Sequence, residues 1–125
     1  MGLLSGLLGN ASTVDANELK EKYGQLFTED EEVKIGFKLI RDTFIFTNFR
    51  LILIDIQGLT GRKTEYLSIL YNEISRFSIE TAGHFDLDGE LKIWVGSASE
   101  PALTKKFNKQ VNIYDVQKVL ASHIK

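Results

Sequence analysis

Asp55 is the ionisable residue of this sequence whose setting is most unusual, because it interrupts the apolar run at residues 51–56. In a strand it points to the same side as Leu53, which is the side expected to be buried. A buried carboxylate needs hydrogen-bonding or cationic partners, and the candidates are Arg50, Arg76 or a basic residue of another subunit. Catalysis would require a second acid or base beside it, which the sequence does not place there. We therefore predict a structural or interface role for Asp55, and Arg50 is predicted to share the interface.

Three basic residues, Lys34, Lys38 and Arg41, are the weak candidates for binding an anion or a lipid headgroup. Lys34 and Lys38 share one face of an expected strand, whereas Arg41 has the opposite parity. The turn that follows them is too short to fold around a headgroup. A solvated or intersubunit charged face is the simpler interpretation, because alternating surface charges need no ligand.

The sequence predicts no catalytic, cofactor or metal site. It has no cysteine, which excludes thiol nucleophiles and thiolate metal sites, and its two histidines are His84 and His123. Asp86 and Asp88 stand in an acidic segment, but Gly89 follows at once and breaks the calcium-loop spacing. We expect a hairpin turn there, a turn position for His84 and an exposed helix position for His123. The chain is accordingly not expected to be an enzyme.

The first residues are apolar and carry four leucines, Leu3, Leu4, Leu7 and Leu8, at the spacing of one helical face. A short amphipathic helix that docks on this domain or on a sister subunit is the favoured interpretation, and these leucines are candidate oligomer-interface residues. Membrane contact is the alternative. It is disfavoured because no Lys or Arg occurs in this segment to attract anionic lipid.

Composition limits the class of protein. The chain has 125 residues and is 43% hydrophobic, enough for one domain with one core. Its 15 Lys and Arg against 17 Asp and Glu give a net charge of -2, so the basic field of a nucleic-acid-binding protein is missing. No signal peptide pattern and no span of about 20 apolar residues occurs. Together with the absence of cysteine, this predicts a cytoplasmic protein.

The periodicity of apolar residues changes twice along the chain. Residues 16–27 have helical spacing, with Asp15 as the expected N-cap, and a second helix follows Asn112 near the end. Between the helices the period is that of strands, and the predicted strands are 33–40, 44–46, 50–57, 63–71, 74–81, 90–96 and 102–107. Such a chain is expected to be mainly β, a seven-stranded antiparallel barrel or sandwich capped by the C-terminal helix. We divide it into an N-terminal helical extension, 1–28, and the barrel with its helix, 29–125.

A resemblance supports this fold. The stretch from Thr47 to Gly83 and the later FDLDGELKIWV are similar to the bacterial pleckstrin-homology-like family, as is the opening MGLLSGLLGNAS. Arg50, Asp55 and the pairs Gln57-Gly58 and Asp88-Gly89 are among the residues that carry the resemblance. It implies the pleckstrin-homology superfold and self-assembly into ring-like homo-oligomers, with a pentamer as the candidate ring. It implies no reaction and no cofactor.

Two functional hypotheses follow. The first is a non-enzymatic binding and assembly module that partners itself and leaves room for an unknown protein partner. The alternative is a peripheral membrane or lipid-sensing module that uses the N-terminal leucines and the basic side chains. Neither hypothesis involves nucleic acid.

Overall fold

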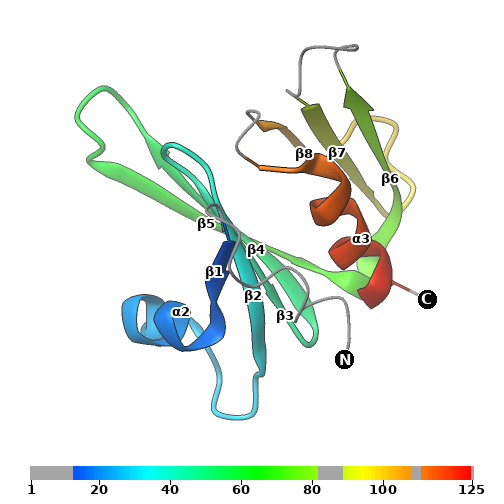
Figure 1. The fold of residues 1–125 in the computed structure, drawn as a ribbon. Helices are drawn as coiled ribbons and strands as arrows, with labels where there is room; N and C mark the ends of the chain where they lie inside the picture. Colours follow the sequence, from blue (N-terminus) through cyan, green and yellow to red (C-terminus); the bar gives the residue numbers. More distant parts are fainter. Residues whose placement is uncertain (1–12, 82–88, 108–110, 125) are drawn as a thin grey trace.

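Two antiparallel sheets form the body of the protein, which we describe from a computed structural model over residues 13–81, 89–107 and 111–124 (Figure 1). The first sheet has five strands in the order β1-β2-β3-β4-β5. These strands are β1 (Thr13–Asp15), β2 (Val33–Lys38), β3 (Thr43–Thr47), β4 (Arg50–Gln57) and β5 (Lys63–Leu70). The second sheet has three strands, β6 (Ile74–Thr81), β7 (Gly89–Val95) and β8 (Leu103–Phe107).

The seven strands predicted from alternation are present as β2 to β8, and β1 is an additional strand that the sequence did not indicate. β1 pairs with β2 through Thr13↔Phe37 and Asp15↔Ile35. It has only three residues, too few to show a period.

The strands do not close into the barrel that was one form of our prediction, because hydrogen-bonded pairing stops between β5 and β6 in the described chain. A short 3₁₀ turn, η2 (Tyr71–Glu73), lies at this corner. The backbone of this turn hydrogen-bonds to two other turns of the chain. The Tyr71 N–H donates to Phe49 O at 3.2 Å, and Glu73 O accepts from the Gly96 N–H at 3.0 Å. The corner thus lets β6 leave the first sheet and begin the second.

Both faces of β4 are buried over residues 51–54, which explains the nearly continuous apolar sequence of this strand. Leu51 and Leu53 face the main core between the two sheets, with Phe44 and Phe107. Ile52 and Ile54 face a second, smaller core. Alternation therefore gives no polar face along the first half of β4.

The smaller core lies under helix α2 (Ala16–Tyr23), which begins at the predicted N-cap: Asp15 Oδ1 accepts from the Glu18 N–H at 2.9 Å. The helix ends earlier than predicted and continues as the 3₁₀ turn η1 (Gly24–Leu26). Leu19 packs so closely on β2 that a Cβ added at Gly36 would lie 2.9 Å from Leu19 Cδ1. Over its described residues the predicted extension is therefore joined to the sheet by strand pairing and by packing.

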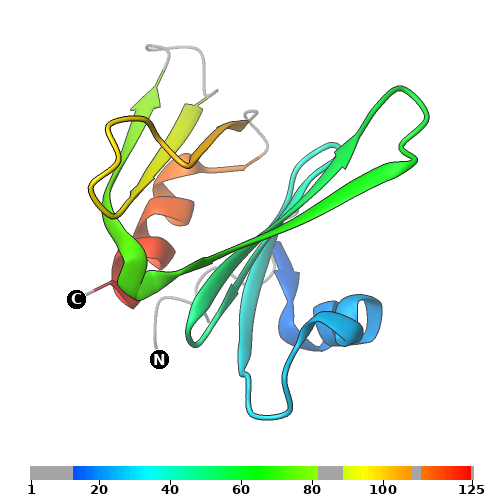
Figure 2. The same cartoon turned by 180° about the vertical axis from the view of Figure 1, so that it is seen from behind.

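Helix α3 (Ile113–His123) closes the other side of the main core (Figure 2). The Asn112 side chain caps it by accepting from the Tyr114 N–H at 2.9 Å. The apolar stripe of the helix is fully buried, namely Ile113, Val116, Val119 and Leu120. The predicted capping helix is confirmed.

Candidate functional site

The turn between β3 and β4 is organised by one buried hydroxyl. Thr47 is fully buried, and its Oγ1 accepts from the N–H groups of Phe49 (3.3 Å) and Arg50 (3.1 Å). Asn48 ties the same turn to the segment before β2, because its Oδ1 accepts from the Glu32 N–H at 2.9 Å. The turn is thereby held rigidly, with Phe49 at its outer surface.

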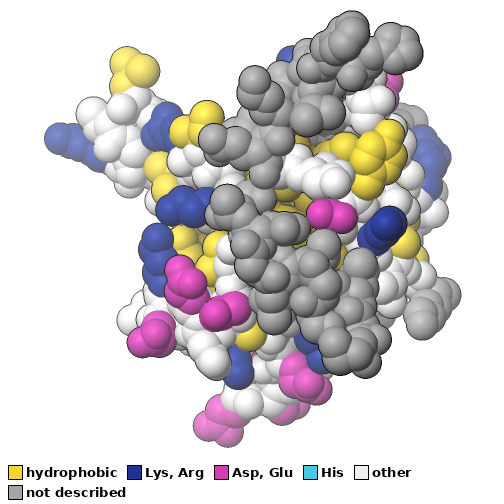
Figure 3. Space-filling view, viewed as in Figure 1, with side chains coloured by type: hydrophobic (Ala, Val, Ile, Leu, Met, Phe, Trp, Pro, Cys, Tyr) yellow, Lys and Arg dark blue, Asp and Glu magenta, His cyan; other side chains and the backbone are white. Residues whose placement is uncertain are grey.

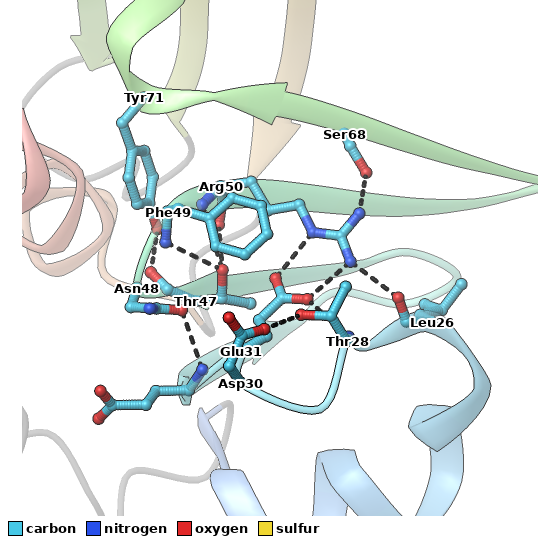
Figure 4. A network of polar contacts seen from close by, with 11 residues as sticks. Leu26, Thr28, Asp30, Glu31, Thr47, Asn48, Phe49, Arg50, Ser68 and Tyr71 are labelled. Carbon is cyan, nitrogen blue, oxygen red and sulfur yellow. Dashed lines mark hydrogen bonds and ion pairs between the residues drawn. The ribbon is translucent and has the colours of Figure 1, made fainter.

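Arg50 at the start of β4 makes an internal network with four of its five N–H donors (Figure 4). Nε and Nη2 donate to the two carboxylate oxygens of Glu31 at 2.7 and 2.8 Å. Nη2 also donates to Leu26 O at 2.8 Å, and Nη1 to Ser68 Oγ at 3.0 Å. The two-oxygen geometry is the strong form of this ion pair, and it fastens η1 and the following loop to β4 and β5.

Glu31 has a fully buried side chain, although it lies in an acidic run, residues 29–32, whose other members are exposed. Burial alone would raise the pKa of Glu31, but hydrogen bonds from Arg50, Thr47 and the Thr28 N–H, together with the charge of Arg50, hold that pKa below its ordinary value. The carboxylate is therefore ionised inside the fold, and its role is structural.

An open groove of about 510 Å³ adjoins this network, where the β3–β4 turn, the end of β5, η2 and the end of α3 meet. Its residues include Asn48, Phe49, Leu70, Tyr71, His123 and Ile124. The aromatic side is firmly built: Tyr71 donates its hydroxyl to Thr47 O at 2.7 Å, and its ring stacks on that of His123 with centroids 4.7 Å apart. Burial raises the pKa of Tyr71, so this hydroxyl stays protonated as a donor.

Two apolar side chains of the groove remain uncovered. Phe49 is 39% exposed and Leu70 is 43% exposed. The guanidinium of Arg50 lies 5.4 Å from the centre of the Phe49 ring and holds it in place. A rigid groove with exposed apolar side chains and two side-chain amides suits the binding of an apolar or amphipathic segment.

Asp55 lies between the two sheets, and its cationic neighbour is Lys105 of β8, not Arg50 or Arg76. Lys105 Nζ is 3.0 Å from Asp42 Oδ2 and 3.8 Å from Asp55 Oδ2. Asp55 also accepts from Gln57 Nε2 at 3.2 Å. Arg76 is instead engaged with the ring of Trp94, at 4.4 Å from its centre. The carboxylate of Asp55 thus has partners within its own chain.

The structure does not gather the three basic candidates into one site. Lys34 Nζ pairs with Glu32 at 3.2 Å, and Lys38 is exposed near the end of β2. Arg41 donates from Nη2 to Gly58 O at 2.6 Å, which joins the β2–β3 turn to the β4–β5 hairpin. Gly58 and Gly61 of that hairpin have φ values of +82° and +68°, a conformation that glycine adopts without strain.

At the tips of these two neighbouring turns, apolar side chains point into solvent. Ile40 is 81% exposed and Leu59 is 104% exposed. In the space-filling view, apolar and basic side chains lie side by side on the projecting β4–β5 hairpin at the upper left (Figure 3).

Several predictions made from the sequence fall outside the described residues: the leucines Leu3, Leu4, Leu7 and Leu8, and His84, Asp86 and Asp88. His123 was expected to be exposed, and this was wrong, because its ring is partly buried against Tyr71 and Phe46. Over the described residues, no group of three His, Cys, Asp or Glu side chains could hold a metal ion. No described helix is both long and apolar enough to cross a membrane.

Sequence reasoning missed the groove because three segments that are far apart in the sequence build it. One signal was available: Phe49 is a large apolar residue in the Asn48–Arg50 turn, where a polar residue is usual. Nothing local marks Tyr71 and His123 as neighbours, since they are far apart in the sequence.

The two sheets, the corner at η2 and the capping helix define a pleckstrin-homology-like fold. The sequence model of the family described as "Bacterial PH domain" matches residues 2–124. The chain belongs to this family, which confirms the resemblance drawn from the sequence.

Relatives and solved structures agree with this assignment. The chain is 56% identical over 122 residues to the Bacillus subtilis protein "Uncharacterized protein YjqA", covering 98% of both chains. It is 29% identical over 119 residues to YozO of the same organism, covering 95% of this chain and 97% of that one. The crystal structure of a pleckstrin homology domain from Shewanella amazonensis matches with a TM-score of 0.84 and 43% identity, over 99% of both chains. The crystal structure of a DUF1696 family protein with a pleckstrin-homology domain from Shewanella loihica matches with a TM-score of 0.76 and 43% identity. This match covers 92% of this chain and 97% of that one.

Proposed function

We propose that this bacterial PH domain is a non-enzymatic binding and assembly module of the cytoplasm that forms closed homo-oligomers, with a pentameric ring as the candidate form. The observation that carries the proposal is the outer edge of β5. The edge of β5 presents backbone N–H and C=O groups that another copy of the chain can bind by hydrogen bonds. Such binding requires no catalytic residues.

β5 is long for an edge strand, with eight residues, and among the described strands it pairs only with β4. Most of its side chains are exposed, including Tyr66 at 50% and Leu70 at 43%. Natural proteins shorten, charge or cover such edges, because open strands attract other strands. A copy of the same chain is the cover that we propose. A ring uses two different surfaces of each copy, and β6 and β8 offer further edges at the second sheet.

Tyr66→Lys tests this edge, and Tyr114→Lys is its matched control on α3, since the two tyrosines are 50% and 54% exposed. We expect light scattering of the intact chain to give a whole-number multiple of 14.1 kDa, and Tyr66→Lys alone to lower that mass. A monomeric mass for the unmodified chain at micromolar concentration would overturn the proposal.

Arg50 and Asp55, the polar residues predicted at the interface, are mostly engaged within the chain. Arg50 holds Glu31, and Asp55 lies near Lys105. Their contribution to assembly is therefore proposed to be indirect: Arg50 fixes the β3–β4 turn and Ser68 of β5, and so shapes the surface that a copy meets.

A second candidate function is peripheral membrane contact, and the tips at Ile40 and Leu59 are the observation that favours it. Two protruding apolar side chains beside Lys38, Arg41 and Arg62 could enter the headgroup region of an anionic bilayer. Leu59→Ser should then weaken co-sedimentation with phosphatidylserine vesicles without changing the oligomer mass. Equal sedimentation of the unmodified chain and Leu59→Ser would remove this candidate.

A further inference from the structure

We propose that the tip of the β4–β5 hairpin of one copy, residues 58–62, docks in the groove of a neighbouring copy. The proposal rests on the homo-oligomer proposed above and assigns two surfaces through which the copies meet. The tip supplies Leu59, and the groove supplies the exposed side chains of Phe49 and Leu70. Contact among these side chains removes apolar surface from water in both copies.

The tip combines an apolar side chain with positive charge. Leu59 is fully exposed, and Arg62 and Lys63 follow it in the hairpin with exposed side chains. Apolar and basic side chains lie together on this projecting hairpin (Figure 3). The turn is also held in shape, because Gly58 O accepts from Arg41 Nη2 at 2.6 Å.

The groove combines apolar side chains with negative charge beside it. Glu32 adjoins the groove, because the groove residue Asn48 binds its N–H. Glu73 directly follows the groove residue Asn72. Both carboxylates are exposed, and Glu32 keeps 70% of its side-chain surface exposed although Lys34 lies 3.2 Å from it. The basic tip and the acidic margin of the groove therefore attract each other, whereas two tips or two grooves repel.

A chain cannot place its own tip in its own groove. Phe49 directly precedes β4 and the tip directly follows it, so the eight residues of this strand separate the two surfaces. At about 3.3 Å per residue, β4 alone spans roughly 23 Å. The ribbon shows the hairpin projecting away from η2 and α3 (Figures 1 and 2). The contact is therefore one between copies, and it joins two different surfaces, as a closed ring requires.

The absence of cysteine from the chain makes a direct test available. The variant Thr60→Cys/Asn72→Cys places one thiol at the tip and one in the groove and keeps all three apolar side chains of the contact. The full chain is first sized by light scattering and then mildly oxidised. A disulfide forms only where the two Cβ atoms come within about 4.5 Å. The matched control is Thr60→Cys/Tyr114→Cys, because Tyr114 is exposed on α3 and does not line the groove.

We expect a covalent ladder extending beyond the dimer for Thr60→Cys/Asn72→Cys and only traces of it for the control. The single variants Thr60→Cys and Asn72→Cys report pairing between like positions and should give at most dimers. An oligomeric mass without crosslinks, or equal ladders in both double variants, would overturn the docking while leaving the homo-oligomer in place. A monomeric mass would overturn both.

Leu59→Ser separates a second copy from a bilayer as the partner of the tip. If the tip docks in a groove, this variant lowers the mass of the oligomer in the absence of lipid. An unchanged mass would overturn the docking. Weaker co-sedimentation with phosphatidylserine vesicles at that unchanged mass would assign the tip to the membrane instead.

Discussion

At one end of the first sheet, around the β3–β4 turn, Arg50 makes four internal hydrogen bonds and Glu31 is fully buried, whereas at the other end the hairpin tips expose Ile40 and Leu59. We call these the turn end and the tip end. Each has a lysine or arginine beside carboxylates, but Lys105, Asp42 and Asp55 between the sheets near the tip end keep 15 to 23% of their side-chain surface exposed. The two cations are similarly exposed, Arg50 at 17% and Lys105 at 21%, so the difference lies in the carboxylates: water reaches Asp42 and Asp55 but not Glu31.

Arg50→Met removes the ion pair with Glu31 at the turn end and is expected to lower the free energy of unfolding the most. It leaves the buried Glu31 carboxylate without its cation, which costs about 3–5 kcal/mol in a buried ion pair. Chemical denaturation at neutral pH measures the loss. Arg50→Met/Glu31→Leu should recover much of the stability, because no uncompensated charge remains. A double variant as unstable as the single one would show that packing, and not charge, holds this end.

Leu120→Ala tests whether α3 holds the turn end through the main core. Leu120 is fully buried one turn before His123, which stacks on Tyr71. Removing its buried methyl groups should lower the free energy of unfolding by about 2–5 kcal/mol. Denaturant titration of Leu120→Ala beside Tyr114→Ala, on the exposed face of the same helix, makes the comparison. Similar small losses for both variants would mean that the helix lies on the surface.

The pH dependence of stability sharpens the comparison through Glu31. Its folded pKa lies below the ordinary value of 4.5, so its stabilising contribution is complete above about pH 4.5 and is lost as the pH falls through the folded pKa. Glu31→Gln should be less stable at neutral pH, and the gap from the unmodified chain should narrow as the solution is acidified. Denaturation curves at stepwise lower pH test this, and a gap that stays constant would contradict it.

Lys105→Met is the matching change for the cluster near the tip end and has the smallest expected effect. It should lower the free energy of unfolding by about 1 kcal/mol or less. Its two carboxylate partners are partly exposed and can recover water. Denaturation of Lys105→Met and Arg50→Met under one buffer condition compares the two clusters directly. A loss for Lys105→Met as large as that for Arg50→Met would remove the distinction between them.

The sequence predicted what depends on local periodicity. Strands β2 to β8 and helix α3 could be placed because their apolar residues alternate, form a short continuous run or recur at helical spacing. The division into two sheets could not, since it depends on the corner at η2, where backbone groups bind Phe49 O and Gly96 N–H from distant turns.

The candidate sites were less predictable than the fold. Asp55 was predicted to have Arg50, Arg76 or another subunit as its cationic partner, whereas its cationic neighbour is Lys105. Lys105 is fifty positions away in the sequence, and no local pattern predicts this contact. The burial of Glu31 could not be predicted from the sequence, because its neighbours are acidic and exposed. Only the folded structure shows that Arg50 pairs with Glu31 and not with the other acidic residues at positions 29–32.

Gly36 allows helix α2 to pack closely on the first sheet. Leu19 rests directly on its backbone, and a single methyl group added there would meet Leu19 at 2.9 Å and Phe44 O at 3.1 Å. A side chain larger than methyl would have to displace the Leu19 side chain, so the close packing of α2 on the sheet depends on glycine at this position. The chain that follows α2 brings Leu26 O and Glu31 to Arg50, so this packing also bears on the buried ion pair.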